Sequence, residues 1–247
     1  MKTRLLLLIC IIASFASCSN AQEAATAPAK PKSSAAAPAI KPWLLPANHV
    51  NHDKYYERRA THFGYLPTGK DDIIMFGNSL TDGAEFNELL GNPNVKNRGI
   101  IGDIIPGLMD RLEPVVAGQP AKIFILAGVN DISHNVGPDS VARAMDQLIT
   151  EIKHRSPRTR IYLQSLLPFN NNVQMWKYLK DKEQEVVQAN ALYEKLAKKH
   201  GVTWINLYPL FDDGTGRLKA QYTNDGLHLM GEGYIIWRDA IKPYIDE

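Results

Sequence analysis

Four short segments hold the residues of this chain that could do chemistry together. They are 77–81 (GNSLT), 97–103 (NRGIIGD), 128–131 (GVND) and 225–228 (DGLH). The first three follow short apolar runs that are typical of strands, and the fourth lies in the last loop. A serine, a glycine, an asparagine and an Asp-x-x-His pair in this order offer a nucleophile, amide donors and a base. Acyl transfer requires this set of groups.

Ser79 is the candidate nucleophile, because it lies just after an apolar run that ends at Gly77. A serine hydroxyl is a weak nucleophile at neutral pH, so it needs a base within hydrogen-bond reach and a group that orients the base. His228 and Asp225 fit these roles, since their spacing lets the carboxylate reach one imidazole nitrogen while the other faces Ser79. Gly226 makes the tight loop feasible. The Gly-x-Ser-x-Gly elbow of the α/β-hydrolases is missing here.

A tetrahedral oxyanion requires hydrogen-bond donors that are fixed before the reaction. The loops after the second and third apolar runs offer the backbone amide of Gly102 and the side-chain amide of Asn130. The backbone amide of Ser79 is a third donor. The sequence therefore predicts an oxyanion hole made of Ser79, Gly102 and Asn130.

Strand-like and helix-like segments alternate along the chain. The expected strands are 73–76, 95–97, 123–126, 161–164 and 202–205, and the expected helices are 53–63, 104–116, 140–154, 180–200 and 232–245. This alternation predicts an α/β fold with a parallel sheet that is covered by helices on both faces and joined by right-handed crossovers. Ligand sites in such sheets lie at the carboxyl ends of the strands, where three of the four segments fall.

The four segments resemble the sequence blocks of the SGNH, or GDSL-type, hydrolase family, with a similarity that extends from about Asp71 to the end of the chain. The resemblance implies a three-layer α/β/α sandwich with a flavodoxin-like sheet of five parallel strands. It also implies a hydrolase that uses no metal and no cofactor. In this family pattern Ser79 is the nucleophile, Gly102 and Asn130 complete the oxyanion hole, and His228 with Asp225 completes the triad.

One position departs from the family pattern, because Asn78 stands where the Gly-Asp-Ser-Leu block has aspartate. Asparagine keeps the size and one acceptor of aspartate but loses its charge. We therefore expect the loop shape to be retained and the local electrostatics to change. The departure also keeps open a different class of function, in which the chain is a surface carbohydrate-binding module that retains the fold without turnover.

Three further sequence features point to a substrate class. The segments 55–59 (YYERR), 97–103 and 225–234 (DGLHLMGEGY) resemble secreted bacterial members of the family that are similar to sialate and other carbohydrate O-acetylesterases. A more distant similarity is to the catalytic subunits of platelet-activating-factor acetylhydrolase. Both imply hydrolysis of acetyl or other short acyl esters, on a small-molecule or glycan substrate. The alternative within the same class is a lysophospholipase or other lipid acyl hydrolase, although no long apolar insertion suggests a lid.

Several polar residues near the four segments have two interpretations each. Arg98 is either a structural ion-pair partner of an acid such as Asp103, which we favour, or a substrate contact. Asp103 itself caps the next helix or braces the nucleophile loop, and Asp131 is expected to cap a helix. The segment 168–176 (PFNNNVQMW) leaves the fourth expected strand on the same edge, so Asn170 and Trp176 are candidate sugar contacts.

Composition excludes some other functions. The chain has 247 residues, 22% charged residues and a net charge of +2, which gives no sign of nucleic-acid binding. No histidine shows a metal-ligand spacing with cysteine, and 212–216 (DDGTG) is more typical of a turn than of a calcium loop. The sequence therefore predicts no metal.

The first residues predict export. A basic start at 1–4 is followed by an apolar run at 5–16 that is too short to span a bilayer. We expect a signal peptide over 1–18 with lipidation of Cys18, or else cleavage after residue 21. An Ala-, Pro- and Lys-rich stretch over 19–45 predicts a disordered tether, followed by the hydrolase domain over 46–247.

This leader implies a bacterial protein that crosses the inner membrane and becomes a periplasmic, outer-membrane or cell-surface lipoprotein. Its only membrane contact would be the lipid anchor. Cys10 and Cys18 are the two cysteines of the chain, and both lie in or at the edge of the signal. The mature domain is therefore expected to have no internal disulfide.

Overall fold

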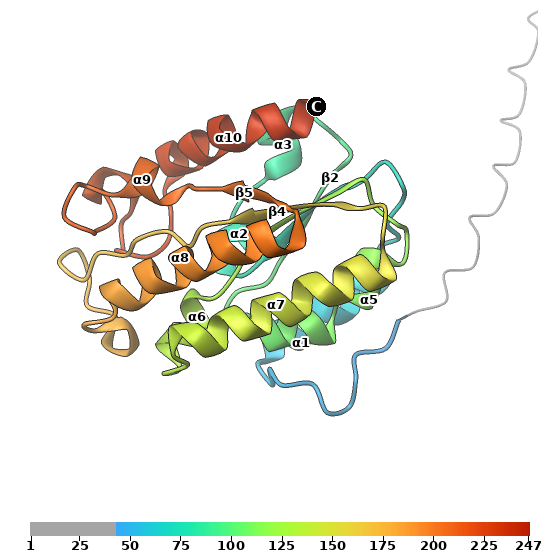
Figure 1. Cartoon of the computed structure of the whole chain (residues 1–247), viewed down its shortest axis with the longest axis horizontal. Helices are drawn as coiled ribbons and strands as arrows, with labels where there is room; N and C mark the ends of the chain where they lie inside the picture. Colours follow the sequence, from blue (N-terminus) through green and yellow to red (C-terminus); the bar gives the residue numbers. More distant parts are fainter. Residues whose placement is uncertain (1–42) are drawn as a thin grey trace, which may run out of the picture. The chain divides into compact units, whose positions relative to one another are not determined.

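The computed structural model describes residues 43–247 (Figure 1). The predicted signal peptide, the lipidated Cys18 and most of the predicted tether lie outside the described residues. Trp43 and Leu45, which fall within the predicted tether, pack against a buried group made of Tyr56, Ala60, Phe63 and Ile100. Packing therefore begins before the predicted domain boundary at 46. Within residues 43–247, no helix is both long enough and apolar enough to cross a membrane.

Five parallel strands form one sheet, in the order β2-β1-β3-β4-β5 (Figure 1). Their bounds are β1 Ile73–Gly77, β2 Val95–Gly99, β3 Lys122–Leu126, β4 Arg160–Gln164 and β5 Thr203–Ile205. The central strands β1 and β3 are buried along their whole length, as strands covered on both faces must be. The prediction of a flavodoxin-like sheet of five parallel strands is confirmed.

Helices cover both faces of this sheet. The α-helices of the described chain are α1 Lys54–Phe63, α2 Ser79–Asp82, α3 Phe86–Leu90, α4 Ile105–Asp110, α5 Glu113–Val116, α6 Val129–Ser133, α7 Pro138–Arg155, α8 Glu183–His200, α9 Tyr208–Phe211 and α10 Gly231–Asp246. Two short 3₁₀ turns are η1 Lys177–Leu179 and η2 Ala220–Tyr222.

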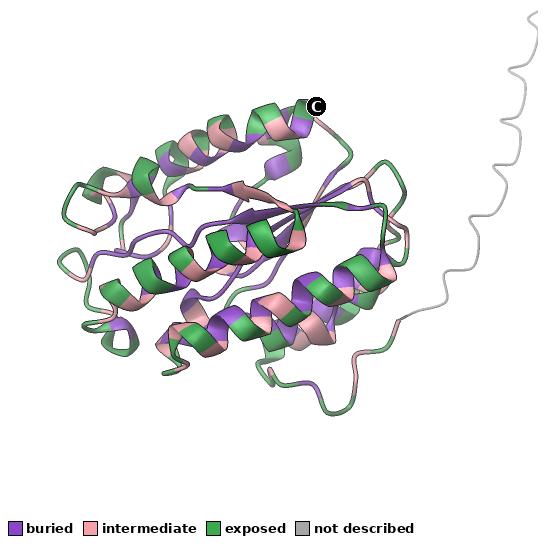
Figure 2. Ribbon diagram, in the orientation of Figure 1, coloured by how far each residue is buried: buried purple, intermediate pink, exposed green. Residues whose placement is uncertain are grey.

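Alternate side chains of one strand enter two different cores, as the period of a β-strand requires. Ile74 and Phe76 of β1 pack with buried residues of α4, α5, α7 and α8. Ile73 and Met75 of the same strand pack with buried residues of α3 and α10. Figure 2 shows the resulting pattern, in which the helices are purple toward the sheet and green on the outside. The expected three-layer α/β/α sandwich is confirmed.

The predicted helix over 104–116 is wrong as a single element, because the chain forms α4 and α5 with a break at Arg111 and Leu112. Pro114 lies in the first turn of α5. A proline there tolerates its missing N–H, whereas inside a continuous helix it would remove a hydrogen bond and clash with the preceding turn. The break leaves Arg111 free to turn inward, where it has a role described below.

Candidate active site

Ser79 begins α2, directly after the carboxyl end of β1. Asn78 is the N-cap of α2, and its side-chain oxygen accepts a hydrogen bond from the Leu80 amide at 3.1 Å. The turn is tight, because a Cβ on Gly77 would lie 2.4 Å from both the Leu126 carbonyl oxygen and the Thr81 hydroxyl. A strand that ends in glycine and continues into a capped helix therefore fixes the position of the Ser79 side chain.

Asn78 is fully buried, and its side-chain nitrogen has no hydrogen-bond partner among the described residues. An aspartate at this position would present an oxygen instead of that N–H group. Asparagine and aspartate share the side-chain oxygen Oδ1, and this is the atom that caps α2 here by accepting the Leu80 amide. The cap agrees with the expectation that the loop around Ser79 keeps its shape.

Ser79, His228 and Asp225 lie in one hydrogen-bonded line, although Ser79 is far from the other two in sequence. His228 Nε2 is 2.9 Å from Ser79 Oγ, and His228 Nδ1 is 2.7 Å from Asp225 Oδ2. The second carboxylate oxygen, Oδ1, accepts hydrogen bonds from the backbone amides of Leu227 and His228 at 2.9 and 2.8 Å. Because both oxygens are held, the carboxylate can orient the imidazole and keep its proton on Nδ1.

The electrostatics of this loop favour an ionised Asp225. Burial alone raises the pKa of the Asp225 carboxyl, but the hydrogen bonds from the His228 side chain and from the His228 and Leu227 amides outweigh burial. The pKa of Asp225 is therefore lowered from its ordinary value. An ionised carboxylate beside Nδ1 would stabilise the imidazolium that forms when Nε2 accepts a proton.

Gly226 permits this loop, because its φ of 82° is favourable only for glycine. A Cβ at this position would also lie 2.2 Å from the Asn170 carbonyl oxygen. The Asn170 amide donates to the Gly226 carbonyl oxygen at 2.6 Å, so the loop after β4 packs directly on the loop that holds Asp225 and His228.

Asn130, Gly102 and Ser79 approach the same edge of the sheet from three loops, because β1, β2 and β3 are neighbours and parallel. Asn130 Nδ2 donates one hydrogen bond to the Asp103 carbonyl oxygen at 2.9 Å, which orients the amide and leaves its second N–H. Gly102 is exposed and has a φ of 75°. Among the hydrogen bonds of the described residues, none uses the backbone amide of Gly102 or Ser79. These donors remain available to a ligand.

Replacing Asn130 with alanine should lower kcat for a short ester by about 10²- to 10³-fold, because one oriented donor is lost. KM should change much less, since the donor would act on charge that develops only in the transition state. Steady-state kinetics on p-nitrophenyl acetate measures both constants. Asn87→Ala, on the exposed face of α3, is the matched control and should retain full activity. Equal rates for both variants would exclude Asn130 from the oxyanion hole.

Arg111 braces the loops that carry these groups, although no motif in the sequence marks it. Its fully buried guanidinium forms an ion pair with Asp103 at 2.8 Å and donates to the carbonyl oxygens of Arg98 and Gly77 at 2.8 and 3.0 Å. Gly77 is two residues before Ser79, and Asp103 follows Gly102. The ion pair of Arg111 and Asp103 therefore links the loop of Gly102 to the loop of Ser79. The other oxygen of Asp103 accepts from the Ile104 amide at 2.9 Å. Of its two expected roles, Asp103 therefore has the bracing of the nucleophile loop, through Arg111, whereas its bond to the Ile104 amide stops one residue before α4.

Arg98 has neither an ion pair with Asp103 nor access to a substrate. Only 4% of the residue is exposed, its guanidinium lies 5.0 Å from the centre of the Phe63 ring, and it donates to its neighbour's carbonyl oxygen. Burial lowers the pKa of Arg98 to about 10. The candidate substrate contact is wrong, because this side chain is buried beneath Phe63 of α1. The expected ion pair with Asp103 is made by Arg111 instead.

Asp131 caps a different helix from the one that contains it. Its carboxylate accepts the amide of Ile105, at the start of α4, at 3.1 and 3.3 Å. The residue is 3% exposed, and burial raises the pKa of its carboxyl to about 7. Asp131 follows Asn130 directly, so this bond ties the segment after β3 to α4, the helix that follows Gly102.

This raised pKa predicts a loss of stability as the pH rises. The unfolded chain ionises Asp131 near pH 4, whereas the folded chain holds the proton until about pH 7. The folded state therefore binds more protons between these values, and the free energy of unfolding should fall across this window by a few kcal/mol at most from this group.

Asp131→Asn should remove that contribution, because the amide keeps an acceptor for Ile105 and cannot ionise. Urea unfolding of both proteins at pH 4 and at pH 8 tests this, since other titrating groups cancel in the difference. The variant should gain stability relative to the wild type at pH 8. A stability difference that is the same at both values would contradict the prediction.

Trp176 and Asn170 lie beside the site but are occupied by the protein itself. Trp176 Nε1 donates to the Asp225 carbonyl oxygen at 2.7 Å, and its ring meets the His228 ring edge to face, with centroids 5.7 Å apart. Asn170 is 6% exposed; it donates to the Leu218 carbonyl oxygen and accepts from the Asn172 amide. Asn170 as a sugar contact is therefore wrong. Trp176 is a positioning group for the loop of Asp225 and His228.

Trp176→Phe should lower kcat by about tenfold, because the ring contact with His228 is retained while the hydrogen bond to Asp225 is lost. Trp204→Phe, on β5, is the matched control and should leave kcat unchanged. Kinetics of both variants, with circular dichroism to verify folding, measures the effect. A normal kcat in Trp176→Phe would show that the hydrogen bond does not position the loop.

A pocket of about 290 Å³ opens beside Ser79 and His228 and is lined otherwise by Gly83, Ile101, Leu229 and Tyr234. Most of these side chains are apolar, and Tyr234 uses its hydroxyl to donate to the Leu80 carbonyl oxygen at 3.0 Å. A larger cavity, of about 620 Å³, is lined by segments that precede β1 and β3 and so lies at the opposite end of the sheet. The smaller pocket is the one that a bound acyl group could share with Ser79.

Comparison with known proteins agrees with this architecture. The model of a GDSL-like lipase/acylhydrolase family matches residues 75–236. A GDSL-like lipase from Bacteroides thetaiotaomicron is 28% identical, with a TM-score of 0.67 over 77% of this chain and 97% of that one. A protein from Streptococcus pneumonia that is described as a platelet activating factor is also 28% identical. Its TM-score is 0.69 over 78% of this chain and 93% of that chain.

A third structure shares the fold at lower identity. It is a variant of an acetyl-xylooligosaccharide esterase from Geobacillus, 19% identical, with a TM-score of 0.60 over 73% of this chain and 96% of that chain. No curated protein matches the chain.

Proposed function

Because this chain belongs to the GDSL-like lipase/acylhydrolase family, we propose that it is a serine esterase that removes acetyl or other short acyl groups. The observation that carries the proposal is the line of hydrogen bonds from Asp225 through His228 to Ser79, which ends at a small pocket. Residues from two distant parts of the sequence meet there at the distances that proton transfer requires.

The proposed reaction begins when Ser79 Oγ attacks the ester carbonyl carbon and His228 Nε2 accepts its proton. The resulting oxyanion accepts hydrogen bonds from the Ser79 and Gly102 amides and from Asn130 Nδ2. His228 then donates the proton to the leaving alcohol, which leaves an acyl group on Ser79. Water, deprotonated by His228, attacks this acyl group and releases the carboxylic acid.

The size of the pocket supports a short acyl group. A volume of about 290 Å³ is at or below the lower end of pockets that hold drug-sized ligands, and Leu229 and Tyr234 limit it. A long acyl chain would need a longer apolar groove, and the larger apolar cavity is at the other end of the sheet. We therefore place lipid acyl hydrolysis second.

The alcohol side of the substrate is proposed to be a carbohydrate. The loop that packs on Gly226 exposes polar side chains, among them Asn172 and Gln174, next to Trp176. Exposed amide groups can donate hydrogen bonds to sugar hydroxyl groups and accept hydrogen bonds from them. The Geobacillus esterase named above acts on acetylated xylo-oligosaccharides, but at 19% identity that likeness concerns the fold alone.

Hydrolysis of p-nitrophenyl esters of increasing acyl length, together with acetylated sugars and a lysophospholipid, tests the proposal. The acetyl ester and an acetylated sugar should be the best substrates. A rate that rises with acyl length would favour the lipid hydrolase. Glycan binding without turnover above the Ser79→Ala background would favour the carbohydrate-binding module, for which the buried Asn78 is the motivating residue.

We also propose that the chain is exported and anchored through Cys18 as a bacterial lipoprotein, on the basis of its first residues. Metabolic labelling with a lipid precursor should mark the wild type. Label that persists in Cys18→Ala would exclude this anchor.

A further inference from the structure

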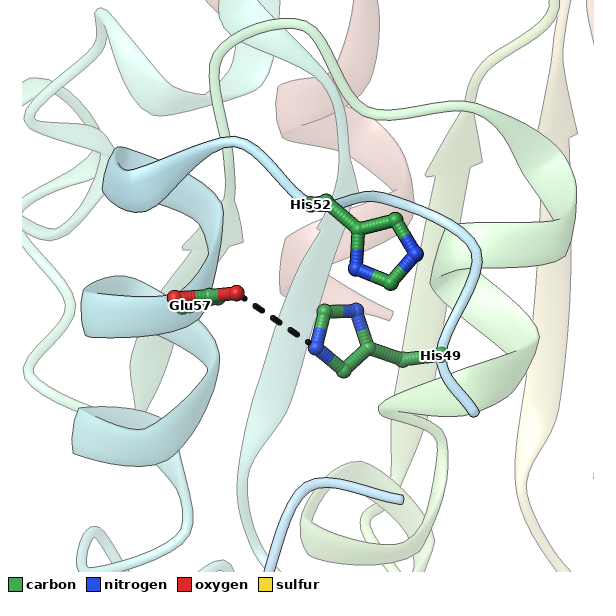
Figure 3. Close-up of side chains that lie close together, drawn as sticks. All are labelled: His49, His52 and Glu57. Carbon is green, nitrogen blue, oxygen red and sulfur yellow. Dashed lines mark ion pairs between the residues drawn. The ribbon is translucent and has the colours of Figure 1, made fainter. Parts of the chain in front are cut away.

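Two histidines and a glutamate gather at the start of α1, and none of them lines the pocket beside Ser79. His49 and His52 precede the helix, and Glu57 is in its first turn (Figure 3). One ligand atom from each residue lies within 4.8 Å of the other two. The two imidazole rings are tilted by 49° to each other with centroids 4.7 Å apart, and the Glu57 carboxylate is turned toward His49.

His49 is held in place before any ligand binds. The residue is 9% exposed, its amide donates to the Pro46 carbonyl oxygen at 3.1 Å, and its ring lies 5.9 Å from that of Tyr56. The next amide, of Val50, donates to Asp110 at 2.8 Å. The backbone at His49 is thus fixed to α4, and the His49 ring packs against Tyr56 of α1.

The buried His49 ring also has an unused polar atom. Its Nδ1 has no hydrogen-bond partner among the described residues, and Figure 3 shows this edge of the ring facing His52. Buried polar atoms are rarely left without a partner, so this one calls for a function. His49 Nε2 is 3.6 Å from Glu57 Oε1.

We propose that His49, His52 and Glu57 form a binding site for a zinc-like divalent transition-metal ion. Ligand atoms at 2.0 to 2.1 Å in a tetrahedral zinc site are about 3.3 Å from one another, and each of the three residues offers one atom within 4.8 Å of the other two. His52 is exposed, so its ring can rotate to shorten these distances. Two imidazoles and one carboxylate favour zinc over magnesium or calcium.

The metal would act as a structural clamp. It would join the segment before α1 to the first turn of that helix, and the Tyr56 hydroxyl in turn donates to the Gly107 carbonyl oxygen of α4 at 2.7 Å. Asp110 of α4 accepts the hydrogen bond of the Val50 amide, which lies between the two histidines in the sequence, so the same segment is also tied to α4. Binding would therefore stabilise the folded state by an amount that rises with the logarithm of the zinc concentration once that concentration exceeds Kd.

Titration of the full chain with ZnCl₂ in a calorimeter tests the site. We expect one ion per chain, and at least tenfold weaker binding in His52→Gln and in Glu57→Gln. Both substitutions alter partly or fully exposed side chains, so folding should not be affected. His62→Gln is the matched control, because His62 is an exposed histidine in the last turn of α1; this variant should bind zinc as the wild type does.

A second measurement separates a clamp from loose surface binding. Zinc should raise Tm of the wild type and of His62→Gln, and it should fail to raise Tm of His52→Gln. Replacement by Co²⁺ should give visible absorption bands whose intensity falls in Glu57→Gln. Equal zinc affinity in all four proteins, or no stoichiometric binding to the wild type, would overturn the proposal.

Discussion

Ser79→Ala should lower kcat/KM for p-nitrophenyl acetate by about four to six orders of magnitude. The substitution removes the hydroxyl that lies 2.9 Å from His228 Nε2, which among the described residues is the one bonded to this nitrogen and able to form an acyl-enzyme. The remaining amide donors could still bind the ester and polarise its carbonyl, so a small residual rate is expected. Folding should be unaffected, because Ser79 is only half-buried and its side chain does not cap α2.

Ser140→Ala is the matched control, since it removes a serine hydroxyl on α7 that accepts a hydrogen bond from Arg143, far from Ser79 in the sequence. Burst kinetics adds a second measurement, because the wild type should release one equivalent of p-nitrophenol quickly if deacylation is slow. Mass spectrometry of the quenched protein should locate the acyl group on Ser79. Turnover that persists in Ser79→Ala at a tenth of the normal rate would require another nucleophile.

Asp225→Asn should have the second largest effect, a fall in kcat of about 10⁴-fold. The carboxylate accepts from His228 Nδ1 at 2.7 Å, which keeps the imidazole proton on that nitrogen. An asparagine that turns its NH₂ group toward Nδ1 would force the proton onto Nε2. The base could then no longer accept the Ser79 proton, although the geometry of the three side chains would be almost unchanged.

The orientation of the asparagine follows from the backbone. The Leu227 and His228 amides both donate to Oδ1 at 2.9 and 2.8 Å, so the oxygen of an asparagine would occupy that place and its NH₂ group the other. Kinetics at several pH values and a crystal structure of the variant test this. Asp139→Asn, on the exposed surface of α7, should retain activity. A loss below tenfold in Asp225→Asn would remove Asp225 from the proposed triad.

The fold could be predicted from sequence because each of its signals is local. Alternating apolar residues and β-branched runs such as 73–76 define strands, and the intervening helix-period segments define crossovers. Once the sheet is known to be parallel, its carboxyl ends must lie along one edge. The prediction that failed is the single helix over 104–116, because the chain breaks before Pro114 and forms two helices there.

The candidate active site could be predicted to a similar depth for residues whose backbone surroundings are encoded beside them. Ser79 lies two residues after Gly77, where a Cβ would collide with the neighbouring chain, and Asp225 and His228 share one loop around Gly226, whose φ is positive. The structure brings these three together. His49, His52 and Glu57 have no spacing with cysteine that would mark them as metal ligands in the sequence, and they form a group only because the segment before α1 folds back on the first turn of that helix.

The sequence by itself determined the layers of the fold, the order along the chain of the loops at the carboxyl ends of the strands, and the types of residue in these loops. Only the tertiary structure decided which side chains pair across elements. Arg111 takes the ion pair with Asp103, and Arg98 is buried against Phe63. Trp176 binds the Asp225 carbonyl oxygen of a loop 49 positions later in the chain. Local structure depends on neighbouring residues, whereas partners from distant elements depend on strand register and helix packing, which no short segment encodes.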